Sequence, residues 1–588
     1  MISSESVLYH YWKHESFREP QKEIIEHVLA NKDCIALLPT GGGKSICYQI
    51  PALLKEGICI VISPLIALIE DQIDSLQKKN IKVASIPSGK TENEIIALFD
   101  NLKYGNFKFL YLSPERLQSR LIQEKIKELN VNLIAVDEAH CISEWGHDFR
   151  PSYRKISILK NFFPDIPCNA LTATANSKVL HDINENLGLE NAVTFKKSFF
   201  REGLAYQVFT VENKLLRLKQ IFTKTKSPGI VYVSTRKKAE EIANYLNENG
   251  FPAAYYHGGL DKSLKTEAFE AWMSETKRIM VSTNAFGMGI DKGNVGIVVH
   301  FDIPYSIENY IQESGRAGRN LKKAFAVLLK NEHDISMFKQ RQKEVVPSMD
   351  EIKKVHKKLY QFLRVSLGEK PENALSFDLN KFCHDYDFKA QKVRAIFTIL
   401  ENYGIIENSK DQQNKSTIQF MVDSKKVISY AINNIYLKNF IDSLLRTYTG
   451  LFQQIVYINE FELAKKNSCT SSQVIQYLEQ LHKDEILIYE PSSKNSKLMF
   501  LVPREDDRTI NRHEKEINNY LKQKNSKTRE LLDYISNNSV CRSIQLLGYF
   551  DEPSQKKCGI CDVCLRTKKK TLKILNQKFS ICWKLINH

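Results

Sequence analysis

A glycine-rich loop that ends in lysine and serine is the first part of the chain with chemical meaning. Leu37-Leu38-Pro39-Thr40-Gly41-Gly42-Gly43-Lys44-Ser45 follows an apolar stretch that predicts a buried strand and precedes a predicted helix. Glycines let backbone N–H groups turn onto phosphate oxygens, and a helix N-terminus adds its positive end. We therefore expect this loop to surround the phosphates of ATP, with Lys44 on the β- and γ-phosphates and Ser45 on Mg²⁺.

Two carboxylates supply the other half of such a site. Leu133-Ile134-Ala135-Val136 predicts a buried strand, and Asp137-Glu138-Ala139-His140 follows it directly. We expect Asp137 to share Mg²⁺ with Ser45, Glu138 to act as general base for the attacking water, and His140 to belong to the same catalytic group. Acidic pairs are common on surfaces, but behind a phosphate loop this pair predicts an ATP hydrolase.

These motifs resemble superfamily-two helicases over almost all of the chain up to Lys330. Phe17-Arg18-Glu19-Pro20-Gln21 resembles the adenine-reading motif, which implies that Gln21 pairs with the base edge and Arg18 stacks on it. His14 stands where many relatives have a tyrosine on the base. Gln312-Glu313-Ser314-Gly315-Arg316-Ala317-Gly318-Arg319 resembles the motif of the second lobe, which implies Arg319 as the finger on the γ-phosphoryl group and Arg316 as its helper.

The segment after His140 favours one branch of that superfamily. Cys141-Ile142-Ser143-Glu144-Trp145-Gly146-His147-Asp148-Phe149-Arg150-Pro151-Ser152-Tyr153 resembles the aromatic-rich loop of RecQ DNA helicases. Flat and cationic side chains stack on unpaired bases without reading them, which implies DNA contacts by Trp145, His147, Phe149 and Arg150. A buried aromatic cluster is the alternative. The resemblance implies an ATP-dependent helicase that moves 3′ to 5′ on single-stranded DNA and opens duplex or forked DNA in repair, recombination or replication.

Four cysteines near the C-terminal end have the spacing of a metal site. Cys541 is followed by Cys558-Gly559-Ile560-Cys561-Asp562-Val563-Cys564, so four thiolates could close around one structural Zn²⁺. An iron–sulfur cluster or inert thiols are the alternatives. The segment from about Asp506 to Thr567 is polar, so we expect the ion to hold it together while the motor lobes keep separate cores. The pattern resembles the RecQ zinc module.

The order of predicted elements gives the fold class. Alternating helices and short apolar runs predict two tandem RecA-like, doubly wound α/β lobes, with a cleft between them. Two later stretches, Leu379–Val422 and Phe461–Val502, each show two helices and then two strands, which predicts two winged-helix-like α+β modules in sequence. Plain packing modules are the alternative. The predicted domains are 1–205, 206–345, 346–425, 426–505, a helical zinc-binding module at 506–570 and a basic tail at 571–588.

Composition limits the remaining possibilities. The 588 residues carry 84 Lys and Arg against 68 Asp and Glu, and this charge of +16 favours a polyanionic partner without proving one. No secretory signal or bilayer-spanning run is present, so we expect a cytoplasmic protein, nucleoid-associated if bacterial, with no membrane partner and reduced thiols. Protein partners are not predicted. An RNA helicase and a winged-helix DNA-binding protein with an inactive motor are the rival interpretations.

Overall fold

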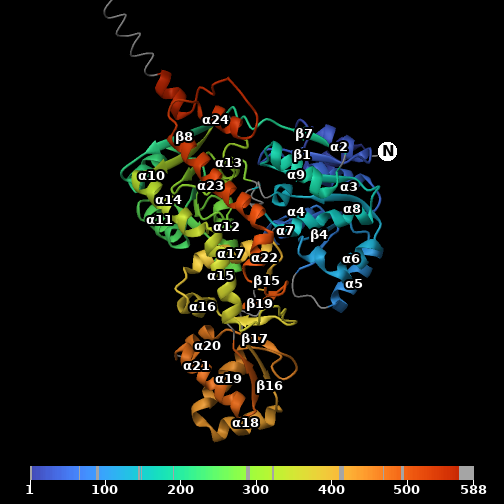
Figure 1. The fold of residues 1–588 in the computed structure, drawn as a ribbon, viewed down its shortest axis with the longest axis vertical. Coiled ribbons are helices and arrows are strands. Elements are labelled where there is room, and N and C mark those ends of the chain that lie inside the picture. Colours follow the sequence, from blue (N-terminus) through green and yellow to red (C-terminus); the bar gives the residue numbers. More distant parts are fainter. Residues whose placement is uncertain are drawn as a thin grey trace, which may run out of the picture. The chain divides into compact units, whose positions relative to one another are not determined.

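The computed structural model describes residues 3–64, 66–87, 92–143, 146, 149–189, 191–286, 292–320, 323–409, 416–467, 469–491 and 496–568. The chain forms two compact units (Figure 1). One joins Met1–Lys343 to Asn519–His588, and the other is Glu344–Asn518. The second unit is therefore an insertion in sequence between the motor lobes and the C-terminal segment. Among the described residues, no helix combines the length and apolar character needed to cross a bilayer.

The first lobe contains a parallel sheet, as its continuous apolar runs predicted. In the described residues the sheet has seven strands in the order β3-β4-β2-β5-β6-β1-β7, and β2 and β5 are buried along their whole length. Such strands lie inside because helices cover both faces. The strands are β1 Cys34–Leu37, β2 Ile58–Ile62, β3 Val83–Ser85, β4 Phe109–Leu112, β5 Val131–Val136, β6 Cys168–Thr172 and β7 Val193–Lys196. The helices are α1 Ser4–Trp12, α2 Gln21–Leu29, α3 Ile46–Leu54, α4 Ile66–Gln77, α5 Glu92–Tyr104, α6 Arg120–Lys127, α7 Pro151–Arg154, α8 Ile158–Phe162 and α9 Ser177–Leu187.

The second lobe repeats this architecture with a sheet of its own. Its described strands lie in the order β10-β11-β9-β12-β13-β8, and every neighbouring pair is parallel. The predicted class of two doubly wound lobes is confirmed. The strands are β8 Leu204–Thr210, β9 Gly229–Tyr232, β10 Ala253–Tyr256, β11 Ile279–Ser282, β12 Ile297–His300 and β13 Ala324–Lys330. The helices are α10 Lys214–Lys224, α11 Arg236–Glu248, α12 Lys262–Met273, α13 Ile307–Ser314 and α14 Glu332–Val345.

The C-terminal segment packs against both lobes through α23 (Glu514–Ser536) and α24 (Arg542–Tyr549) (Figure 1). Leu531, Tyr534, Ile535 and Leu546 belong to the core of the second lobe, while Leu547 and Phe550 belong to that of the first. The rings of Phe199 and Phe550 stack 4.2 Å apart. The expectation of a polar segment beside lobes with separate cores is therefore wrong, because widely spaced apolar residues of this segment complete both motor cores.

The inserted unit contains two small antiparallel sheets. One has the order β14-β19-β15 and the other β17-β16-β18. The strands are β14 Leu375–Phe377, β15 Ile406–Ser409, β16 Ser416–Phe420, β17 Val456–Ile458, β18 Leu487–Glu490 and β19 Ser496–Phe500. The helices are α15 Met349–Phe362, α16 Leu379–Asp385, α17 Ala390–Asn402, α18 Ser424–Asn433, α19 Ile435–Thr447, α20 Glu460–Lys466, α21 Ser471–Lys483 and α22 Asp507–Arg512.

Among the described residues, the two strands within each predicted stretch do not pair with each other, so the sheets do not follow the two successive stretches. β15 pairs with β19, whereas β16, which follows β15 in the chain, pairs with β17 and β18. The third strand of each sheet therefore comes from the other stretch. We call the sheet of β14, β15 and β19 with α16 and α17 the outer module, and the sheet of β16, β17 and β18 with α20 and α21 the nested module. The nested module lies, in sequence, between two strands of the outer one.

The two modules share one local design. The same number of residues separates Leu379 from Glu460, Ala390 from Ser471 and Ile406 from Leu487, which begin matching elements. Asp378 and Asn459 accept hydrogen bonds from the first turns of α16 and α20 as matching N-caps. Because both modules have the same element order, β16 and β19 can occupy each other's places while every strand remains paired.

Candidate nucleotide and metal sites

A pocket of about 910 Å³ is lined by residues of both lobes. It gathers most of the side chains that the sequence assigned to ATP. Gly42 and His140 are not among its described lining residues. The predicted residues that line it are His14, Arg18, Gln21, Thr40, Gly41, Gly43, Lys44, Ser45, Asp137, Glu138, Arg316 and Arg319.

The phosphate loop has the backbone that its glycines allow. Gly41 and Gly43 have φ of 81° and 74°, in the left-handed region that a side chain disfavours. A Cβ at Gly43 would lie 2.3 Å from Nε2 of Gln21, so no larger residue fits there without movement. Helix α3 begins directly after Ser45, and the loop thus runs from β1 into a helix N-terminus, as an anion site requires.

Arg18 and Gln21 hold this loop from the side. Gln21 Nε2 donates to the carbonyls of Gly42 (3.1 Å) and Gly43 (3.0 Å), and its Oε1 accepts from the backbone N–H of Arg18 (2.8 Å). Arg18 Nη1 donates to the carbonyl of Gly41 (2.9 Å). The two residues that the sequence placed at the adenine therefore also fix the path of the phosphate loop.

The carboxylates follow β5 and face the phosphate loop. Lys44 Nζ lies 3.3 Å from Glu138 Oε1. Burial, followed by the charge of Glu138, raises the pKa of Asp137 to about 6, and the charge of Lys44 opposes this rise. A cation bound at Asp137 would offset the cost of keeping its carboxylate ionised. Together with the Ser45 hydroxyl, these oxygens form a donor set that suits a hard divalent cation.

His140 connects this site to the end of β6. Its Nδ1 lies 3.0 Å from Thr172 Oγ1 and 3.3 Å from Glu138 Oε2. Burial, with the charges of Lys44, Lys527 and Arg150, lowers the pKa of His140 to about 3. The imidazole is therefore neutral at neutral pH, and it lies beside Glu138 but cannot supply a proton as an imidazolium.

The second lobe contributes two arginines to the pocket, Arg316 and Arg319. Helix α13 ends at Ser314, and Arg316 and Arg319 follow it. A Cβ at Gly41 would lie 3.0 Å from Nε of Arg319, so this guanidinium rests on the phosphate loop. Arg201 Nη2 donates to the carbonyls of Ala317 (3.0 Å) and Gly318 (3.1 Å), which fixes the turn that carries both arginines.

The aromatic segment is only partly described, since Trp145 and His147 lie outside the described residues. Phe149 is half-buried, with the guanidinium carbon of Arg154 4.9 Å from its ring centroid. Arg150 Nη1 donates to the carbonyl of Pro64 (2.7 Å). Arg150 thus also anchors the segment to the first lobe, a role that its sequence context did not indicate.

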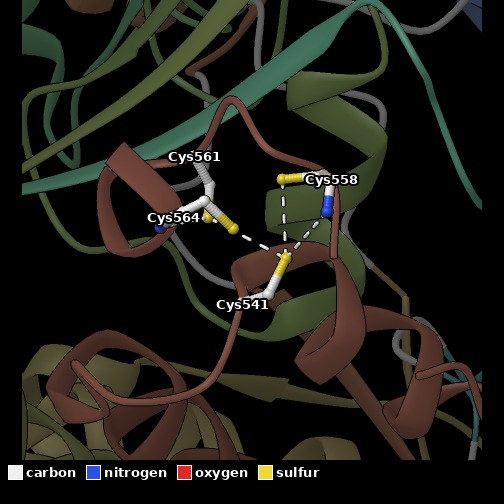
Figure 2. Close-up of side chains that lie close together, drawn as sticks. All are labelled: Cys541, Cys558, Cys561 and Cys564. Carbon is white, nitrogen blue, oxygen red and sulfur yellow. Dashed lines mark hydrogen bonds between the residues drawn. The ribbon is translucent and has the colours of Figure 1, made fainter. Parts of the chain in front are cut away.

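The four predicted metal-ligand cysteines converge on one point (Figure 2). All their sulfur atoms lie within 4.8 Å of one another. Cys541 is the N-cap of α24, and its sulfur lies 3.5 Å from that of Cys558. Four sulfurs from one helix start and one tight turn fit a closed tetrahedral Zn²⁺ site. The spacing in the sequence is therefore confirmed as a cluster in space.

Arg542 and Asp562, each next to a cysteine of the cluster in the sequence, form a buried ion pair that no motif indicated. Arg542, which is fully buried, donates to Asp562 through Nε (3.0 Å) and Nη2 (3.1 Å). Asp562 stands between two of the cysteines, and a bidentate pair of this kind fixes the direction of both side chains. The sequence did not indicate this pair, because one arginine and one aspartate do not form a recognisable sequence motif.

Family models match the chain in four places. "DEAD/DEAH box helicase" matches 18–183, and "Helicase conserved C-terminal domain" matches 213–321. "RecQ helicase winged-helix domain, Bacteroidota" matches 418–491, and "RecQ zinc-binding" matches 504–565. The winged-helix match begins and ends within the nested module, between β15 and β19.

A comparison over about two thirds of the chain decides the family. "ATP-dependent DNA helicase RecQ" of Bacillus subtilis (strain 168) is 40% identical over 422 residues, which cover 68% of this chain and 71% of that protein. The chain belongs to the RecQ family. The RecQ helicase of Pasteurella multocida (strain Pm70) is 43% identical to this RecQ-family chain over 327 residues, 55% of the chain and 51% of that relative. The second match thus spans about half of each protein.

Solved structures match this RecQ-family chain with low sequence identity. The DUF1998 helicase MrfA, bound to DNA and AMPPNP, has 20% identity and a TM-score of 0.49, with 58% of this chain and 53% of that chain covered.

Proposed function

We infer that this RecQ-family chain is an ATP-dependent DNA helicase, which hydrolyses ATP to move along single-stranded DNA and open the duplex. The inference rests on the contact between Arg319 and the phosphate loop. Arg319 of the second lobe rests on Gly41 of the first, so the nucleotide pocket is completed only when both lobes contribute. A site shared in this way changes shape during hydrolysis, and relative movement of the lobes then drives translocation.

Each residue of the site has a proposed task. Lys44 and the loop from Thr40 to Gly43 bind the phosphates, while Ser45 and Asp137 would hold Mg²⁺. The metal ion would neutralise charge on the β- and γ-phosphates. Glu138 accepts the proton of the attacking water, and neutral His140 keeps its carboxylate in place. Arg319, helped by Arg316, stabilises charge on the transferring phosphoryl group. The adenine is held by Gln21, Arg18 and His14.

We further propose how the chain meets DNA. The four residues of the aromatic segment named above would stack on or contact the unpaired strand. Movement from 3′ to 5′, activity on forks, and a role in repair, recombination or replication are proposed from the family. The place of action would be the cytoplasm, at the nucleoid in a bacterial cell. The four clustered cysteines would hold one structural Zn²⁺.

The test is a pair of assays on the purified full chain. Phosphate release from ATP is measured with and without single-stranded DNA, and unwinding is measured on matched DNA and RNA duplexes at fixed salt, because phosphate contacts are salt-dependent. We expect DNA to stimulate hydrolysis and DNA duplexes to be opened. Preferential opening of RNA would favour the rival RNA helicase, and DNA binding without hydrolysis would favour the inactive motor.

A further inference from the structure

Lys527 of α23 lies between the two lobes of the motor and contacts both. Its Nζ donates to the carbonyl oxygen of Gly146 in the first lobe at 2.7 Å. The same atom lies 3.1 Å from Glu308 Oε1 in the second lobe. The side chains of Lys527 and Glu308 are only 15% and 8% exposed. A lysine is rarely buried to this extent unless its charge is paired.

The Gly146 end of this bridge reaches the catalytic carboxylate. A Cβ at Gly146 would lie 2.2 Å from the carbonyl oxygen of His140, so the two backbones are in direct contact. The N–H of Gly146 also donates to the carbonyl of Ser143 (2.9 Å). His140 in turn lies 3.3 Å from Glu138. The aromatic segment at Gly146 therefore lies against the backbone of the residue that stands beside the proposed general base.

The Glu308 end reaches the arginines. Glu308 lies in the first turn of α13, which Ser306 caps by accepting a hydrogen bond from the N–H of Asn309. The helix ends at Ser314 and continues into the turn that carries Arg316 and Arg319. One continuous hydrogen-bonded helix therefore joins Glu308 to the turn that carries the two arginines. Glu308 also interacts with Tyr549. Burial, followed by the charge of Glu308 and a hydrogen bond with it, raises the pKa of the Tyr549 hydroxyl.

We propose that Lys527 is a positioning residue that couples strand binding at the aromatic segment to the placement of Arg316 and Arg319. The proposal rests on the helicase function inferred above. One ammonium group satisfies a carbonyl of the first lobe and a carboxylate of the second only when the lobes lie at the separation seen here. Strand binding that shifts Gly146 alters this bridge, and α13 then carries the change to the nucleotide pocket. The helix that leads into the zinc module thereby becomes part of the motor.

Lys527→Met tests the proposal, since it keeps the length of the side chain and removes the charge. We expect the ratio of DNA-stimulated to basal ATP turnover to fall roughly tenfold, mainly through kcat in saturating DNA rather than through KM for ATP. Lys527→Arg should restore most of the stimulation, because a guanidinium can donate to both oxygens. Lys522→Met, an exposed lysine of the same helix, is the matched control and should behave as wild type.

Glu308→Gln completes the design. If the residues act as one bridge, Glu308→Gln lowers the ratio as Lys527→Met does, and the double variant is no worse than either single one. Wild-type stimulation in Lys527→Met overturns the proposal. Parallel loss of basal rate, stimulated rate, zinc content and melting temperature also overturns it, in favour of a purely structural role. A wild-type chain that DNA does not stimulate would instead refute the proposed function itself.

Discussion

Lys44 and Glu138 face each other across the nucleotide pocket, with 3.3 Å between Nζ and Oε1. Two variants distinguish the proposed roles of Lys44 and Glu138. Lys44→Ala should weaken ATP binding at least tenfold, because the main cation of the phosphate loop is gone. Glu138→Gln should bind ATP normally and lower turnover by about 10²–10⁴. Equilibrium binding of a fluorescent ATP analogue and phosphate release measure the two effects. Near wild-type turnover in Glu138→Gln would remove Glu138 as the general base.

Asp137 gives a prediction for stability against pH. Its pKa is raised from 3.8 to about 6, so the ionised carboxylate is disfavoured in the folded chain. The resulting destabilisation is absent below about pH 4, grows between about pH 4 and pH 6, and is complete above about pH 6. In magnesium-free buffer at pH 7.5, Asp137→Asn should therefore be more stable than wild type by roughly 1 kcal/mol or more.

Thermal unfolding of Asp137→Asn and wild type from pH 4 to 8 measures this difference. The advantage of the variant should disappear toward pH 4. Asp165→Asn, at an exposed aspartate of the same lobe, is the control and should follow wild type at every pH. A variant that is less stable at pH 7.5 would show that Asp137 stabilises the apo fold and contradict this reasoning.

The aromatic segment should connect DNA binding to hydrolysis. Stacking on a base is worth about 1–3 kcal/mol, so the double variant Trp145→Ala/Phe149→Ala should bind single-stranded DNA at least tenfold more weakly. Its stimulation of ATP turnover by DNA should fall as well. Tyr104→Ala, at the most exposed described aromatic residue of the first lobe, is the control. Unchanged stimulation in the double variant would return the segment to a packing role.

Zinc should stabilise the motor as well as its own module. Wild type should contain about one zinc per chain, and Cys561→Ser should lose it. Because α23 and α24 place Tyr534, Leu547 and other residues in both lobe cores, the variant should lose several kcal/mol of motor stability. Cys469→Ser, in the nested module, is the matched control. Metal analysis and thermal unfolding measure both quantities, and a zinc-free chain that is fully folded, or one that holds iron, would contradict the assignment.

The exchanged strands make a prediction that hydrogen–deuterium exchange can check by segment. Phe500 of β19 is fully buried, and its ring stacks on that of Tyr360 at 4.2 Å. Phe500→Ala should cost about 3–5 kcal/mol and speed amide exchange in residues 375–409 of the outer module, leaving 435–490 unchanged. Ile418→Ala in β16 should have the reverse effect. If β19 belonged to the nested module, the two results would be interchanged.

The proposed chemistry of this protein can be predicted from short sequence patterns. The phosphate loop, the acidic pair, the paired arginines and the four cysteines are local patterns, and each indicates a function through residue types at short spacing. Buried parallel strands are equally local, because their apolar runs are continuous, so both lobes were predictable. One segment of this kind, Cys141–Tyr153, indicates the family.

The long-range relationships could not be predicted from the sequence and are visible only in the folded chain. Two modules of the same element order cannot reveal from their sequences which third strand completes which sheet, since either arrangement pairs every strand. The return of α23 and α24 to the motor was also hidden, because their apolar residues gain meaning only beside the lobes that they complete. Lys527 illustrates the physical reason. Its partners Gly146 and Glu308 are distant in the chain, and a buried charge acquires its role from the groups that folding places around it.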